Sequence, residues 1–153
     1  MGITQTEIEE VLHMLAETPE RITAVAQTLS PTQLQIKPDA EAWSVNEILA
    51  HLRACVDVWS KDIDAMLTQD SPTLRYLSPR TYMRKTNYAT LEFAPSFQIF
   101  CVQREALLKK LHTLTLAEWA RDAEIKGRRN TVFSHVRRMA RHESGHCDQI
   151  ESL

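Results

Sequence analysis

Apolar residues recur at intervals of three and four along four long stretches of the chain, which is the period of a helix that buries one face. Pro19 is expected to break or kink the first stretch. Pro95 is tolerable only in a first turn, so the third helix should start near Ala94 rather than at Leu91. We therefore predict four long helices, at about residues 4–29, 44–69, 94–114 and 131–153.

Two of these helices carry clear start signals. Ser44 is followed three residues later by Glu47, which is the spacing of a capping box, and Thr131 is the expected N-cap of the last helix. Between the third and fourth helices we expect a short helical turn at 116–121. The stretch 122–130 contains a glycine and three cations and should be an exposed loop.

The connections differ in length. The segment 31–43 contains two prolines and is expected to be an ordered loop. The segment from 71 to about 90 loses the apolar period, and connections this long in a compact bundle are often functional. A segment of this length can run along a whole helix, so the second and third helices need not be antiparallel.

Composition supports an all-α fold in one domain over residues 1–153. The chain has only three glycines, and sheets and tight hairpins depend on glycine more than helices do. Its length is ordinary for a single domain with its own core. We therefore predict an all-α four-helix bundle.

Charge and hydropathy exclude several partners. The formal net charge of −2 gives no polycationic surface for nucleic acid. No apolar run approaches the roughly 20 residues that span a bilayer, and residues 1–10 lack the apolar core of a signal peptide. The three cysteines are widely spaced and odd in number, which fits reduced thiols. The expected location is the cytoplasm, without nucleic-acid or membrane partners.

Two of the six histidines have the spacing of a helical metal site. His142 and His146 are four residues apart, so their imidazoles project from one helix face, one turn apart. They continue the apolar face of the last helix and therefore point partly into the bundle. A buried pair of imidazoles needs partners for its nitrogens, which either a metal ion or a carboxylate network supplies.

His51 is the third candidate ligand. It lies about two turns into the second helix, where a single histidine is more often a core residue than a ligand. Three histidines with an open further position would make a catalytic type of site for zinc, nickel or ferrous iron. Cys55 is on the same face as His51 and is either a fourth ligand, a reactive thiol or a buried core cysteine. The roles of Arg80 and Tyr82 in the long connection stay open between lining a pocket and packing the loop.

Three separated motifs resemble the DinB/YfiT-like family of four-helix metalloproteins. The segment 41–52, with Trp43-Ser44 and His51-Leu52, looks like that family's opening of the second helix. The ending His142-Glu143-x-x-His146-x-x-Gln149-Ile150 looks like its closing helix. Weaker similarities at 79–82, 103–108, 114–119 and 131–132 follow in the same order.

The resemblance implies an up-down-down-up bundle with a long crossover between helices two and three. It implies that His51, His142 and His146 hold one divalent metal ion, with water at the remaining positions, and that the protein is a homodimer. Related proteins include transferases and isomerases that use bacillithiol, mycothiol or glutathione.

The leading functional hypothesis is a metal-dependent enzyme acting on a small molecule, as a thiol-dependent S-transferase. A metal-dependent hydrolase and a non-catalytic metal- or ligand-binding bundle are the alternatives, because each needs the same three histidines. No catalytic base or nucleophile is evident in the sequence.

Overall fold

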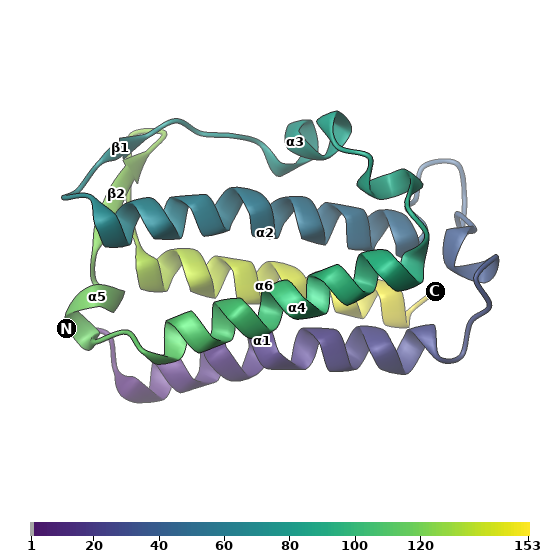
Figure 1. The fold of residues 1–153 in the computed structure, drawn as a ribbon, viewed down its shortest axis with the longest axis horizontal. Helices are drawn as coiled ribbons and strands as arrows, with labels where there is room; N and C mark the ends of the chain where they lie inside the picture. The colour runs from purple at the N-terminus through teal and green to yellow at the C-terminus, as the bar shows by residue number, and fades with distance from the viewer. Residues whose placement is uncertain (1) are drawn as a thin grey trace.

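The computed structural model describes residues 2–153. Four long helices lie side by side, and α2 and α4 run in one direction while α1 and α6 run in the other (Figure 1). The predicted four-helix bundle with an up-down-down-up course is present. The long helices are α1 (Gln5–Ala26), α2 (Val45–Thr68), α4 (Phe93–His112) and α6 (Val132–Glu151).

The predicted helix starts are confirmed. The hydroxyl of Ser44 accepts a hydrogen bond from the Glu47 amide, and the Glu47 carboxylate accepts one from the Ser44 amide. Thr131 caps α6 in the same way, with Ser134 as its reciprocal partner. Pro95 lies in the first turn of α4, as expected.

A small sheet corrects the all-α prediction. The segment expected to be an exposed loop, 122–130, instead forms the antiparallel pair β2 (Asp122–Ile125) and β3 (Arg128–Thr131). The short strand β1 (Thr73–Leu74) adds to β2 in parallel. The sequence gives little sign of these strands, because most of their positions are exposed and several of those carry charged residues. Only Ala123, Ile125 and Asn130 are buried.

The β2–β3 turn depends on a glycine. Lys126 and Gly127 both have positive φ, 54° and 74°, which is the pattern of a two-residue type I′ turn. We expect Gly127→Ala to lower the free energy of unfolding by about 1 kcal/mol, because an added Cβ disfavours positive φ. Urea unfolding of the purified variant measures this loss.

Gly145→Ala is the matched control for that prediction. Gly145 lies inside α6, and an added Cβ there meets nothing within 4 Å. The same substitution should therefore stabilise the protein, by about 0.5–1 kcal/mol. Loss of stability in both variants would contradict the assigned turn.

The long connection between α2 and α4 is tied down along its length. It contains β1, the short helix α3 (Pro79–Lys85) and the 3-10 turn η2 (Tyr88–Thr90), and it passes across α2 (Figure 1). The Tyr82 and Tyr88 hydroxyls both donate to the Asp57 carboxylate of α2, at 3.1 and 2.5 Å. The side chain of Asn46 donates to the Leu91 carbonyl at 3.0 Å. Tyr82 therefore packs the loop, one of the two roles left open for it.

Pro19 does not break α1, because a side chain from α4 takes over the hydrogen bond that proline cannot make. Proline lacks an N–H, so the carbonyl four residues earlier, that of Leu15, loses its partner in the helix. The Arg104 guanidinium donates to that carbonyl at 3.0 Å. The helix therefore continues as one element to Ala26.

Two hydrophobic clusters form the core, one on each side of a polar layer. One cluster contains Leu15, Leu107 and Met139, and the other contains Ile22, Phe100 and Ile150. Between the two clusters lie three buried polar residues, Thr18 of α1, Arg104 of α4 and Glu143 of α6. This polar layer crosses the middle of the bundle.

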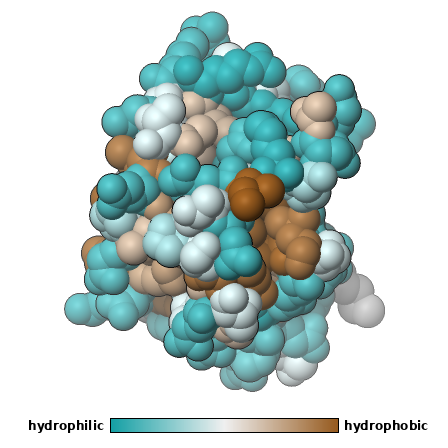
Figure 2. All heavy atoms as spheres, turned by 90° about the vertical axis from the view of Figure 1, so that its right-hand side faces the viewer, coloured by the Kyte–Doolittle hydropathy of each residue, from teal (hydrophilic) through white to brown (hydrophobic). Residues whose placement is uncertain are grey.

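The end of the bundle that carries the 27–44 connection is mostly hydrophilic (Figure 2). Hydrophobic side chains are visible there in small groups, and such groups are ordinary on a protein surface. Over residues 2–153, no helix is both long and apolar enough to cross a membrane.

Candidate metal centre

The three predicted histidines converge at the interface of α2 and α6. The Nε2 atom of His142 lies 3.2 Å from Nε2 of His51 and 3.2 Å from Nε2 of His146. One ligand atom from each ring lies within 4.8 Å of the other two. His51 and His142 are separated by 91 residues in sequence, so the packing of α2 on α6 creates this group.

A hydrogen bond at Nδ1 of His146 sets the tautomer of that ring. The Gln149 side-chain oxygen accepts a hydrogen bond from His146 Nδ1 at 2.9 Å, so Nδ1 carries the proton. In this tautomer the Nε2 atom of His146 presents a lone pair to the other two rings. The Nδ1 atoms of His51 and His142 are buried without a partner among the described residues.

The spacing of the three nitrogens fits a metal ion. Zinc–nitrogen bonds of about 2.0–2.1 Å in tetrahedral geometry place neighbouring ligand nitrogens about 3.3 Å apart. The two Nε2–Nε2 distances of 3.2 Å match this separation. Lone pairs that face one another at such distances repel unless a proton or a cation lies between them. The group therefore has the donor set and spacing of a three-histidine site.

The environment keeps the rings of His51 and His142 neutral, which is the form that binds metal. Burial, followed by the neighbouring histidines and Arg80, lowers the pKa of His51 to about 3. Burial, then His146 and Arg80, lowers the pKa of His142 to about 4. Both imidazoles are therefore unprotonated near neutral pH, so a metal ion would not compete with protons for their nitrogens.

Aromatic side chains and one arginine surround the histidines. The ring of Trp43 lies 4.9 Å from that of His51, and the ring of Trp59 lies 5.2 Å from that of His142. The Arg80 guanidinium, from α3, lies over Trp43 at 4.9 Å. The long connection thus brings a cation beside the histidines. For Arg80, a pocket-lining role stays a prediction.

Cys55 lies beside the histidines. Its Sγ atom is 3.6 Å from Nε2 of His51, one turn along α2. The side chain is fully buried, and burial raises its pKa to about 12. It is therefore a neutral thiol near pH 7 rather than a free reactive thiolate.

The buried Glu143–Arg104 pair lies directly behind the histidines. Glu143 follows His142 in α6 and is 0% exposed. Both its oxygens accept from Arg104, at 2.7 and 2.5 Å, and Thr18 donates to one of them at 2.9 Å. These bonds fix the rotation of α6 about its axis, which aims His142 and His146 toward α2.

The remaining histidines lie elsewhere. His135 is buried and its Nε2 donates to Asp62 at 3.2 Å, outside the three-histidine group. His13 and His112 are on the surface.

The roles of Arg104, Trp43 and Trp59 beside the site were not predicted from the sequence. Trp43 and Arg104 lie in segments that carry the family resemblance and Trp59 lies in α2, but no pattern assigned any of them to the site. The only available signal was Pro19, because a proline inside a continuous helical pattern requires a donor for the orphaned carbonyl. That signal does not say which residue supplies it.

A solved structure with the same fold is available for comparison. The YfiT protein of Bacillus subtilis, described as a probable metal-dependent hydrolase with an unusual four-helix bundle topology, superimposes with a TM-score of 0.87. The two chains are 16% identical over 99% of this chain and 87% of the other. This likeness shows the shared fold. A search of curated proteins gave no match.

The sequence also matches a family profile over most of its length. The match covers residues 14–150, which include all three converging histidines and the Arg104–Glu143 pair. It agrees with the bundle topology and with the resemblance noted in the motifs around His51 and His146. This chain belongs to the DinB superfamily.

Proposed function

We propose that this protein is a metal-dependent enzyme whose three histidines hold one divalent cation, zinc or nickel in preference to iron. The observation that carries the proposal is the convergence of three histidine nitrogens within 4.8 Å, with His142 Nε2 at 3.2 Å from each of the other two. Three protein ligands leave at least one coordination position for a reactant, which is typical of catalytic sites rather than structural ones.

The reaction class follows from what such an ion supplies. A divalent cation lowers the pKa of a coordinated thiol or water, and so provides a nucleophile near neutral pH. Burial keeps the imidazoles of His51 and His142 neutral, and Gln149 holds the ring of His146 in the coordinating tautomer. Arg80 adds a positive charge beside the site, which favours an anionic reactant there.

Our leading version is a thiol-dependent S-transferase that uses a low-molecular-weight thiol of the bacillithiol, mycothiol or glutathione type. The resemblance of the His51 and His142–Ile150 motifs supports this version. A hydrolase is the second version, supported by the description of YfiT from Bacillus subtilis as a probable metal-dependent hydrolase. A homodimer remains a prediction of the resemblance.

Assays of zinc- and nickel-loaded protein test the proposal. We expect turnover of electrophiles with one of the three thiols, its loss on treatment with EDTA, and its return when metal is restored. Turnover of ester or amide substrates without thiol would select the hydrolase. Stoichiometric metal binding without turnover of the electrophiles or of the ester and amide substrates would indicate a non-catalytic bundle. That result would contradict the proposal of an enzyme.

A further inference from the structure

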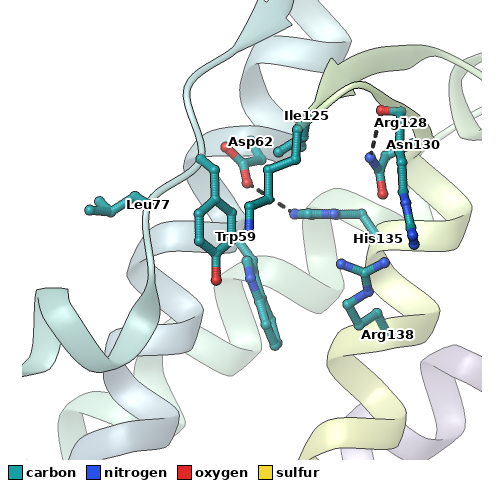
Figure 3. Close-up of a pocket in the computed structure, with 10 residues that line it drawn as sticks. Trp59, Asp62, Leu77, Ile125, Arg128, Asn130, His135 and Arg138 are labelled. Atoms are coloured by element: carbon teal, nitrogen blue, oxygen red, sulfur yellow. Dashed lines mark hydrogen bonds and ion pairs between the residues drawn. The ribbon is translucent and has the colours of Figure 1, made fainter.

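A cavity lined by residues of α2 and α6 lies next to the three histidines. Its volume is about 510 Å³, within the range of small-molecule sites. Two long helices, the β2–β3 hairpin and the segment after β1 enclose it (Figure 3). Trp59 forms one wall and also contacts the ring of His142.

A pair of titratable groups lines the cavity, a buried histidine and a partly buried aspartate. His135 is 3% exposed and donates to the Asp62 carboxylate at 3.2 Å, as the dashed line in Figure 3 marks. Its other nitrogen, Nδ1, is buried with no hydrogen-bond partner among residues 2–153. A buried polar atom without a partner is uncommon in proteins and often marks a functional position.

Three cations line the same cavity without acidic partners. Arg138 comes from α6, and Lys126 and Arg128 come from the hairpin. None of the ion pairs formed within residues 2–153 includes any of these three side chains. Figure 3 shows the side chains of Arg128 and Arg138 beside His135. The cavity therefore has an excess of positive charge, whereas the whole chain has a net charge of −2.

Aromatic surface completes the cavity. Tyr76, from the segment after β1, lines the cavity, and Lys126 rests over its ring at 4.1 Å. Trp59 stands edge-on to His135, with ring centroids 6.1 Å apart. The walls can thus contact a planar or apolar group while the arginines bind an oxyanion.

We propose that this cavity binds a small organic anion, through a carboxylate or phosphate held by Arg128 and Arg138. The remainder of the molecule packs against Trp59 and Tyr76. The inference does not rest on metal binding, because none of the groups it uses is one of the three converging histidines.

The test follows the indole N–H signal of Trp59 by nuclear magnetic resonance while benzoate, phenyl phosphate or the neutral analogue benzamide is added. A Trp59→Phe variant assigns the signal, and the buried Trp119 is the internal reference. We expect saturable shifts with benzoate or phenyl phosphate, and the tighter of the two identifies the preferred oxyanion. No saturable shift with either acid, or equal binding of benzamide, would overturn the proposal.

Two double variants of equal charge make the test specific. Arg128→Gln/Arg138→Gln should bind at least tenfold more weakly, since it removes two charge-assisted contacts. Arg129→Gln/Arg137→Gln should bind as the wild type does, because Arg129 pairs with Asp122 and Arg137 lies over Phe133. Equal weakening in both double variants would reduce the effect to general electrostatics and overturn the site.

The titrations are made on EDTA-treated and on zinc-loaded protein. We expect the anion to bind both proteins with the same affinity. The cavity can therefore bind the anion even if the protein does not retain zinc. Binding seen only with zinc would place the anion on the metal and overturn the cavity as its site.

Discussion

Replacing Arg104 by methionine is expected to destabilise the protein by about 3–5 kcal/mol, a large part of the stability of an ordinary domain. The substitution leaves the Glu143 carboxylate buried without its bidentate partner. It also removes the donor to the Leu15 carbonyl, which Pro19 cannot satisfy. Urea unfolding followed by circular dichroism measures the loss.

The double variant Arg104→Met/Glu143→Leu separates the cost of an unpaired charge from the value of the pair. Removing both charges avoids the buried carboxylate, so this variant should recover much of the stability lost by Arg104→Met. Adding Pro19→Ala should recover more, because residue 19 then donates to Leu15 within the helix. A loss below about 1 kcal/mol in Arg104→Met, the value of an exposed pair, would contradict the structural role.

Removing two of the three histidines is expected to abolish metal binding. After loading and dialysis, the wild type should retain one equivalent of zinc or nickel, and His142→Ala/His146→Ala should retain almost none. A single imidazole, that of His51, does not hold such an ion on its own. Elemental analysis of both proteins gives the stoichiometry.

The matched control for this experiment is His13→Ala/His112→Ala, which removes two surface histidines. It should bind metal as the wild type does. Metal should also raise the unfolding temperature of the wild type and the control, because it binds only the folded protein. At a free metal concentration a thousand times Kd, the added free energy of unfolding is about 4 kcal/mol. Equal and negligible metal in wild type and His142→Ala/His146→Ala would eliminate the site.

Local patterns predicted the helices well because the responsible interactions are close in sequence. Ser44 and Glu47 cap α2 through bonds that span three residues, and the apolar period follows directly from helix geometry. The same holds for His142 and His146, which one helix turn brings together. Such features need no knowledge of the rest of the fold.

The failures involve partners that are distant in sequence. The β2–β3 hairpin has few buried side chains of its own, and it is completed by β1, about fifty residues earlier. Arg104 and Glu143 are 39 residues apart, and each alone has the appearance of an exposed charged residue on a helix. The resemblance placed His51 with the other two histidines; helical periodicity alone did not.

The separation of the histidines along the chain also sets when the site can exist during synthesis. His51 emerges from the ribosome long before its partners, which lie 91 and more residues later. At translation rates of about 5–20 residues per second, that interval is several seconds. In that interval α6, the helix on which α2 packs, has not yet been made. The nascent chain therefore lacks both His142 and His146 and the helix that holds them against α2. Binding of one ion by all three histidines would therefore have to follow translation of the last helix.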